Sequence, residues 1–173
     1  MVKVDTIKEK KPKVFAVSGI KNSGKTTLVE QLVTRLTQLG YKVGVIKHDG
    51  HEFVADHEGT DSYRHKAAGA KNVIVYSKTK MMMVQEHEEP SIEKMIAYQK
   101  DMDIVILEGM KYSTFPKIEV VRSARSKESV CDPETLLAIV TDVPLETSVP
   151  LIGLNDIEGV LEIIKEKILS PLN

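Results

Sequence analysis

The chain has 173 residues, of which 42% are hydrophobic and 28% charged, and its 24 Lys and Arg against 25 Asp and Glu leave a formal net charge of −1. This balance predicts a soluble globular protein without nucleic-acid or membrane partners, because there is no excess of positive charge and no apolar run near the roughly 20 residues of a membrane helix. A charged N-terminus, where a signal peptide would be apolar, and a single cysteine predict a cytoplasmic location.

The first part of the chain predicts a strand, a helix and a strand after a polar, flexible arm over residues 1–12. Residues 13–18 form an apolar run typical of a strand buried on both faces. Leucines recur at helical spacing over residues 25–39, and Gly40 is suited to end that helix. Residues 41–46 are again typical of a strand. This order favours a parallel sheet with a right-handed crossover.

The middle of the chain predicts a loop, a short helix and two strands. Residues 49–59 have no apolar period and are expected to form a loop, followed by a helix over residues 60–68. Residues 72–76 and 80–85 are typical of strands and could pair. The methionines at positions 81–83 could belong to a core or to a dimer interface.

The last part of the chain predicts a further alternation of helices and strands. The expected elements are a helix over residues 91–100, strands over residues 103–108, 117–122 and 136–141, an edge strand over residues 149–153, and a helix that begins at Asp156. We therefore expect one domain over residues 13–173, of the α/β class, with a doubly wound, mainly parallel sheet flanked by helices.

The segment between the first strand and the first helix carries the clearest chemical motif. Gly19-Ile-Lys-Asn-Ser-Gly-Lys-Thr26 matches the Walker A pattern G-x-x-x-x-G-K-[ST] without a mismatch, which predicts a P-loop NTPase fold. Its glycines allow a tight turn whose N–H groups face phosphate oxygens, and the helix N-terminus adds a positive dipole end. Lys25 is expected to reach the β- and γ-phosphates, and the Thr26 hydroxyl to bind Mg²⁺. The predicted nucleotide-binding residues are Gly19, Ile20, Lys21, Asn22, Ser23, Gly24, Lys25 and Thr26.

Carboxylates at the ends of neighbouring strands complete the predicted site. A P-loop site needs such a group to hold the metal's shell or to orient water. Glu108 ends the strand predicted over residues 103–108, and Asp49 follows the strand predicted over residues 41–46. We expect both to join Thr26 at the metal and Lys25 in catalysis, although a solvated carboxylate is the alternative for each.

A polar stretch from residue 48 to residue 64 is typical of a switch loop that Mg²⁺ and a γ-phosphate order. His48, His51, Asp56 and His57 could instead bind zinc or nickel. Their spacing is not diagnostic, and a solvated polar loop is the commoner explanation. Both interpretations stay open at this point.

The residue that reads the base is not identified by a motif. The Asn-Lys-x-Asp pattern of typical GTPases is absent, and the nearest candidates are Thr141 and Asp142, which follow a predicted strand. Asp142 could accept hydrogen bonds from guanine N1–H and N2–H, or could cap the turn before Pro144. The motifs leave GTP and ATP undecided.

Several segments in order resemble the MobB family, molybdopterin-guanine dinucleotide biosynthesis protein B. Besides the P-loop and the Thr-Leu after it, they are Ile-Lys-His-Asp-Gly-His from Ile46, Gly-Thr-Asp-Ser-Tyr-Arg from Gly59, Ala-Gly-Ala from Ala68 and Leu-Glu-Gly-Met-Lys from Leu107. Met110 stands where this family would be expected to carry an aromatic residue.

The resemblance implies a small cytoplasmic protein, usually a homodimer, that binds GTP and Mg²⁺ and has weak GTPase activity. Such a protein assists the attachment of GMP to molybdopterin. The implied partners are molybdopterin and the guanylyltransferase that performs the transfer, so that this chain would be an adaptor and not the transferase.

Carried over residue by residue, the resemblance extends the phosphate loop to Thr27 and supports Asp49 and Glu108 near the metal. The candidates for the switch loop are His48, His51, Asp61, Ser62 and Arg64. Hydrolysis is expected to be slow because the motif places neither a Gln nor an arginine finger at the site. Arg64 is the one candidate for such a finger.

Two other functions stay open from the sequence. A small-molecule kinase shares the strand, P-loop and helix, and Arg122 and Arg125 could form its lid, although an exposed strand end and loop are the plainer interpretation. A metallochaperone GTPase would use the histidines of the polar stretch.

Overall fold

The computed structural model describes residues 11–51, 53–87 and 91–170. All but the last two residues of the predicted N-terminal arm, residues 1–12, therefore lie outside the described residues. The chain divides into two compact units, one formed by the residues up to His48 and from Met95 onward, the other by Asp49–Lys94. The predicted extent of the domain, residues 13–173, stays a prediction.

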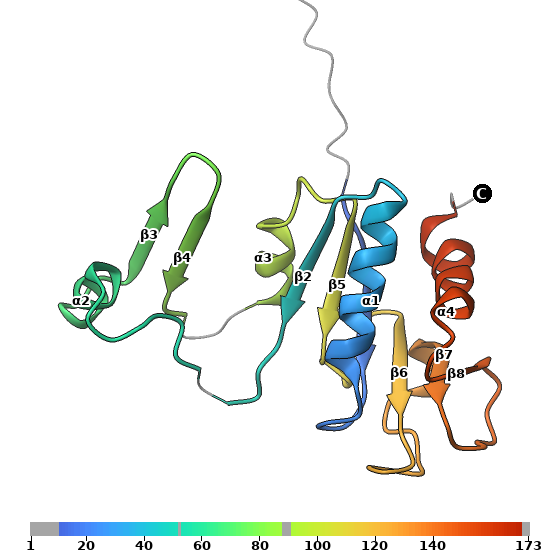
Figure 1. The fold of residues 1–173 in the computed structure, drawn as a ribbon. Helices are drawn as coiled ribbons and strands as arrows, with labels where there is room; N and C mark the ends of the chain where they lie inside the picture. Colours follow the sequence, from blue (N-terminus) through green and yellow to red (C-terminus); the bar gives the residue numbers. More distant parts are fainter. Residues whose placement is uncertain (1–10, 52, 88–90, 171–173) are drawn as a thin grey trace, which may run out of the picture. The chain divides into compact units, whose positions relative to one another are not determined.

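The first unit is built on a parallel sheet. Within the described residues this sheet has six strands in the order β2-β5-β1-β6-β7-β8 (Figure 1). The strands are β1 (Lys13–Ser18), β2 (Val43–Lys47), β5 (Ile104–Glu108), β6 (Lys117–Val121), β7 (Leu136–Thr141) and β8 (Leu151–Gly153). Each neighbouring pair is parallel, which confirms the predicted sheet type.

The central strands of this sheet are buried on both faces. In β1, the side chains of Phe15, Ala16 and Val17 are fully buried, and every residue of β5 and β6 is buried. Burial on both faces favours continuous apolar runs without polar alternation. The same runs in the sequence are the reason that the strands could be predicted.

Two helices cover one face of the sheet and form the main core with it. α1 (Lys25–Gln38) buries Leu28, Val29, Leu32 and Leu36. α4 (Ile157–Ile164) buries its own apolar stripe against the same cluster and continues into a π-helical turn, Lys165–Leu169. The Asp156 carboxylate caps α4 by accepting a hydrogen bond from the Gly159 N–H. Both helices confirm the predicted spacing.

β2 begins two residues later than predicted because the N–H of Tyr41 is hydrogen-bonded to the end of α1. The Gly40 N–H donates to the Thr37 carbonyl at 2.9 Å, and the Tyr41 N–H donates to the Leu36 carbonyl at 3.1 Å. These bonds form a Schellman motif, with Gly40 at a φ of 91°. The chain joins the sheet only from Val43.

The helix predicted over residues 91–100 is shorter in the structure. α3 (Ile92–Ala97) ends where the Gln99 N–H donates to the Ile96 carbonyl, three residues back instead of four. Such bonds tighten the chain and end a regular helix. A short 3-10 helix, η1 (Pro133–Thr135), is an addition that the sequence patterns do not predict. Of the described helices, none is long and apolar enough to span a membrane.

The second unit contains a helix and a hairpin. α2 (Asp61–Ala67) is followed by β3 (Asn72–Tyr76) and β4 (Met81–Gln85), which form the predicted antiparallel pair. Met81 is 70% exposed and Met82 is 37% exposed. Within the part of the chain that the structure describes, these two methionines therefore lie on a surface and not in a core.

Candidate nucleotide-binding site

The P-loop connects β1 to α1 at the carboxyl ends of the parallel strands. Gly19, Asn22 and Gly24 have positive φ angles of 135°, 61° and 105°. A Cβ atom on Gly19 would lie 2.5 Å from the carbonyl oxygen of Val120, so that only glycine fits there. Left-handed residues between right-handed ones turn successive N–H groups toward one point, which is the geometry of an anion-binding nest.

Two features of this loop favour an anionic ligand. Gly24, the residue before α1, supplies no capping side chain, and the first turn of the helix holds no acidic residue. The first N–H groups of a helix have no partner within it, and a negative ligand can supply one. The Ser23 hydroxyl is buried, and among the described residues nothing forms a hydrogen bond with it. A phosphate group would satisfy both.

Thr26 and Glu108, which the sequence places 82 positions apart, meet in the structure. The Thr26 hydroxyl donates to Glu108 Oε1 at 2.5 Å, and the Glu108 side chain is only 9% exposed. Glu108 ends β5 in register with Val17 of β1, so the sheet itself carries its carboxylate to the start of α1. Two of the three predicted metal ligands are therefore side by side.

Lysine side chains surround this carboxylate. Lys25 Nζ donates to the Ile20 carbonyl within the loop at 2.6 Å, and Lys47 Nζ lies 3.9 Å from Glu108 Oε1. Burial lowers the pKa of Lys25, Glu108 opposes that effect, and the charges of Lys111 and Lys47 lower the pKa further. Several cations around one acid give the site a positive character that suits a polyphosphate.

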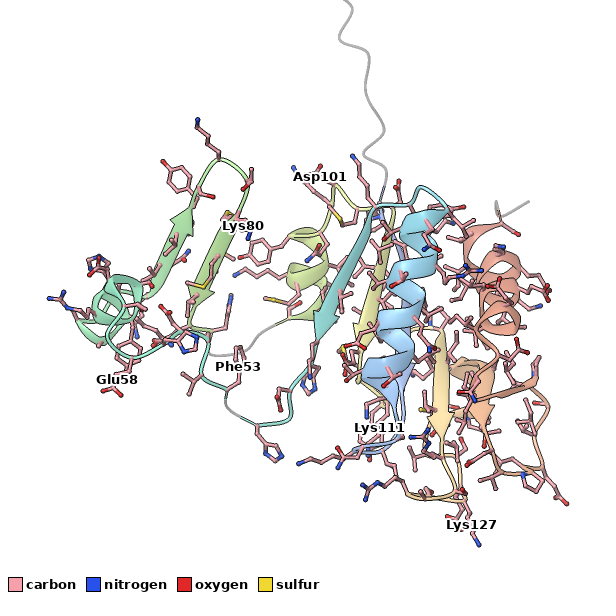
Figure 2. The ribbon with its side chains drawn as sticks, in the orientation of Figure 1. Phe53, Glu58, Lys80, Asp101, Lys111 and Lys127 are labelled. Carbon is pink, nitrogen blue, oxygen red and sulfur yellow. The ribbon has the colours of Figure 1, made fainter. Side chains whose placement is uncertain are left out.

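Lys47 and Lys111 are site residues that the sequence analysis missed. For Lys111 a signal exists, because it lies three positions after Glu108. Lys47 reaches the site through its register with Glu108, which the sequence does not reveal. Lys111 is labelled in Figure 2, on the loop that follows β5.

Asp49, the third predicted metal ligand, belongs to the second unit. Its Oδ1 accepts a hydrogen bond from the N–H of His51 at 3.2 Å, within the same loop. Its role at the metal stays a prediction. In the described residues, no three His, Cys, Asp or Glu side chains gather to hold a metal ion.

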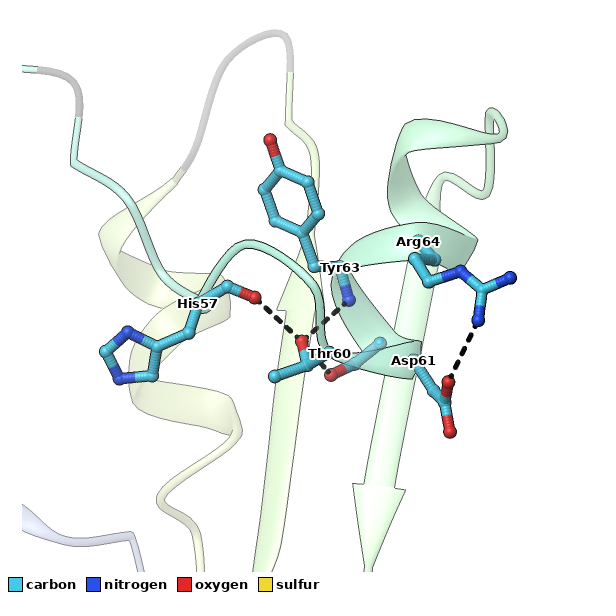
Figure 3. Close-up of polar contacts among 6 residues, drawn as sticks. His57, Thr60, Asp61, Tyr63 and Arg64 are labelled. Carbon is cyan, nitrogen blue, oxygen red and sulfur yellow. Dashed lines mark hydrogen bonds and ion pairs between the residues drawn. The ribbon is translucent and has the colours of Figure 1, made fainter.

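Asp61, Ser62 and Arg64, three of the switch-loop candidates, lie in α2 (Figure 3). His48 instead follows β2 directly, and its N–H donates to the Glu108 carbonyl at 3.1 Å. Thr60 caps the helix: its hydroxyl accepts from the Tyr63 N–H at 3.2 Å and donates to the His57 carbonyl at 2.9 Å. Arg64 and Asp61 form an exposed ion pair at 3.5 Å, which is worth little in stability. The helix thus orders this segment locally.

Asp142 makes contacts that match the capping alternative. Its two oxygens accept hydrogen bonds from the N–H and the hydroxyl of Ser123, at 2.7 Å and 2.8 Å. These bonds lower the pKa of Asp142, with a smaller contribution from the charge of Arg122. The neighbouring Thr141 hydroxyl accepts from the Val143 N–H at 2.9 Å. Base reading by Thr141 and Asp142 stays a prediction.

The comparison with protein families decides the family. Residues 14–142 match MobB, molybdopterin guanine dinucleotide synthesis protein B. The chain belongs to the MobB family. It is 34% identical over 155 residues to the molybdopterin-guanine dinucleotide biosynthesis adapter protein of Haemophilus influenzae, covering 88% of this chain and 87% of that protein. It is 33% identical over 161 residues to the Escherichia coli adapter protein of the same name, covering 88% and 91%.

Solved MobB structures share the fold. The Bacillus subtilis MobB crystal structure matches with a TM-score of 0.71 at 24% identity, over 87% of this chain and 97% of that chain. A MobB protein homolog from Bacillus stearothermophilus matches with a TM-score of 0.65 at 23% identity, over 89% and 99%. The family and the P-loop NTPase fold predicted from the sequence are both confirmed.

Proposed function

We propose that this MobB chain is a GTP-binding adapter in the synthesis of molybdopterin guanine dinucleotide and that it acts with the guanylyltransferase that joins GMP to molybdopterin. The place in that synthesis is supported by the family and by the names of the two bacterial relatives. One observation carries the nucleotide half of the proposal: the uncapped start of α1 lies beside the paired Thr26 and Glu108.

The phosphate loop binds the nucleotide through its backbone and Lys25. The N–H groups of the loop and of the first turn of α1 donate to phosphate oxygens, as does the buried Ser23 hydroxyl. Lys25 exchanges its hydrogen bond to the Ile20 carbonyl for one to a phosphate. The loop is already folded, so little ordering cost accompanies binding.

The residues present fit a magnesium ion. Mg²⁺ prefers hard oxygen ligands and takes only one or two from the protein, the remainder being water and phosphate oxygens. The adjacent Thr26 hydroxyl and Glu108 carboxylate are such oxygens. Bound there, the ion would neutralise phosphate charge, while Thr26 and Glu108 hold it and Asp49 is the further candidate ligand.

We expect hydrolysis to be weak. The motif places no Gln and no arginine finger, the groups that speed GTP hydrolysis, and Arg64 is the one candidate for the finger. Such a chain suits the role of an adapter that holds GTP longer than it cleaves it.

We expect the second unit to supply contacts between two copies of the chain. A two-stranded hairpin alone is marginally stable in water. β3 and β4 nevertheless expose Ile74, Val75, Tyr76 and Met81, each residue by 46% or more. A homodimer that covers these side chains would remove that apolar surface from water.

A reconstituted synthesis tests the adapter role. Purified guanylyltransferase, molybdopterin and Mg²⁺–GTP are mixed with and without this protein, and the dinucleotide formed is measured over time. The proposal predicts faster formation with the protein and a weaker effect with the Lys25→Ala variant. A rate that the protein leaves unchanged, together with failure of a pull-down of the guanylyltransferase with and without GTP, would count against the adapter role.

A further inference from the structure

A depression adjoins the P-loop, and Glu108 is not among the residues that line it. Its walls come from the loop and α1 (Ser23, Gly24, Thr27, Leu28 and Gln31), and from the other strands near their carboxyl ends, with Arg122 after β6, Val140 in β7 and Asn155 after β8. All of these residues belong to the first unit. Of the lining residues outside the loop, only Arg122 was a candidate from the sequence, as part of the lid of a kinase.

The topology places this depression where such sheets bind ligands. From β1 the chain leads to β2 on one side of the sheet, whereas β6, β7 and β8 lie on the other side. Ligands of open α/β sheets bind in the crevice outside the carboxyl ends, at the point where the strand order reverses. Ser23 and Gly24 from the β1 side and Arg122 from the β6 side line that crevice.

The start of α1 fixes which end of a nucleotide enters the depression. Thr26 faces Glu108 of β5, and the next residue, Thr27, lines the depression. Successive residues of an α-helix differ by about 100° in direction, so these two side chains point to different sides. A nucleotide whose terminal phosphates lie at Thr26 therefore extends its nucleoside toward Thr27 and β6.

The lining of the depression is mixed and mainly polar. Leu28, Val120 and Val140 form its floor but expose at most 5% each, and Ser23, Gln31 and Asn155 add polar groups. Two nearby carboxylates are already engaged, Asp156 by the Gly159 N–H and Asp142 by Ser123. Arg122 is the charged side chain that lines the depression.

We infer that this depression holds the nucleoside of GTP and that Arg122 selects guanine over adenine, an inference that rests on the proposed nucleotide function. A guanidinium group only donates, and it matches the two acceptors O6 and N7 of guanine in a bidentate pair. Adenine presents an N6 donor beside N7, which a guanidinium cannot satisfy.

The backbone at Arg122 is fixed by a turn. The Arg122 carbonyl accepts from the N–H groups of Arg125 and Ser126 at 2.8 Å and 2.9 Å, which folds the chain into a turn directly after β6. The Asp142 carboxylate, fixed by Ser123, lies near enough for the Arg122 charge to act on it. Because Ser123 already engages both oxygens of Asp142, the inference assigns the base to Arg122.

Base analogues give the sharpest test. Affinities of the wild-type protein for GTP, ATP, inosine triphosphate and 7-deaza-GTP are measured by calorimetry with Mg²⁺. Because inosine keeps O6 and N7, its triphosphate should bind within a few-fold of GTP, whereas ATP and 7-deaza-GTP should bind about tenfold more weakly. An inosine triphosphate affinity tenfold below that of GTP would overturn the inference, since it would place the reader at the N2 amino group.

Variants of Arg122 complete the test. Arg122→Ala should bring the affinities for GTP, ATP and 7-deaza-GTP to within about threefold of one another while Mg²⁺ dependence persists. Arg122→Lys keeps the positive charge but loses the two parallel N–H donors of the guanidinium, so it should also lose the preference for GTP over ATP. Lys127→Ala, in the same exposed loop, should behave as the wild type. Equal losses for GTP and ATP in Arg122→Ala would overturn the inference by placing Arg122 at the phosphates.

The two proposals fail in different ways. If the wild-type protein binds no nucleoside triphosphate, the proposed function fails and the inference with it. If it prefers GTP and Arg122→Ala keeps that preference, only the assignment of Arg122 is wrong. Thermal melts that coincide for Arg122→Ala and the wild type would show that the variant is folded.

Discussion

Asp142 illustrates how one residue's role depends on a distant partner. A lone strand-end aspartate can bind a base or cap a turn, and the sequence left both open. In the structure its two oxygens accept from Ser123, 19 positions away, and tie the loop after β6 to the end of β7. The bonds stabilise the ionised carboxylate, which is why the pKa of Asp142 falls below its ordinary value.

This contact predicts a pH-dependent contribution to stability. Since the pKa of Asp142 is lower in the folded chain than its ordinary value of 3.8, the contribution is present above that value and is lost as the pH falls through the lower, folded-state pKa. Asp142→Asn should therefore lower the urea midpoint at pH 7 more than at pH 3. The same substitution in a Ser123→Ala background should have a smaller effect, and equal shifts at both pH values would contradict the contact.

At the scale of the element, the two glycines of the P-loop serve different purposes. Gly19 combines a positive φ with close contact, because its Cβ position is occupied by the Val120 carbonyl. Gly24 also has a positive φ, but nothing lies within 4 Å of its Cβ position. The backbone of Gly19 is thus fixed by packing against β6, and that of Gly24 by its own conformation.

The two alanine variants should differ accordingly. Gly24→Ala is expected to cost about 1 kcal/mol of unfolding free energy from conformational strain, and Gly19→Ala about 2 kcal/mol or more because the clash adds to it. Urea denaturation measures both losses of unfolding free energy, provided that the dependence of that free energy on urea concentration is the same for the two variants and the wild type. A Gly19→Ala protein as stable as Gly24→Ala would mean that the loop relaxes away from Val120.

The elements themselves were predictable from local patterns. Buried strands show as continuous apolar runs, and α1 and α4 show as leucine and isoleucine stripes. The boundaries of the elements were less predictable. The start of β2 depends on the hydrogen bond from the Tyr41 N–H to the Leu36 carbonyl, and α3 ends where the hydrogen bonds span three residues instead of four. These are choices between competing backbone partners, which composition does not reveal.

The candidate site also has residues that the sequence predicts and residues that it does not. The P-loop could be read directly because its chemistry lies within eight consecutive residues, Gly19 to Thr26. Lys47, Arg122 and Asn155 could not, because strand register and strand order bring them to the loop. No spacing along the chain encodes those neighbours.

At the scale of the whole molecule, the exposed face of the hairpin predicts association. Tyr76 is 81% exposed and pairs across the strands with Met81, itself 70% exposed. We expect the wild type to sediment as a dimer and the double variant Tyr76→Ser, Met81→Ser to sediment as a monomer, because the change removes apolar surface available for burial. Lys11→Ala, at an exposed position of the first unit, serves as a control and should stay dimeric. A wild type that is monomeric at every concentration tested would contradict this expectation.

The central claim is that the loop from Gly19 to Thr26 binds GTP together with Mg²⁺. Its most direct test is a calorimetric titration of the purified protein with GTP and with ATP, each with and without Mg²⁺, beside Lys25→Ala and the surface control Lys165→Ala. The account predicts Mg²⁺-dependent binding that favours GTP by about tenfold, or about 1.4 kcal/mol, and that Lys25→Ala alone weakens by at least as much. Binding of GTP that Lys25→Ala leaves undiminished, or no binding by the wild type, would contradict it.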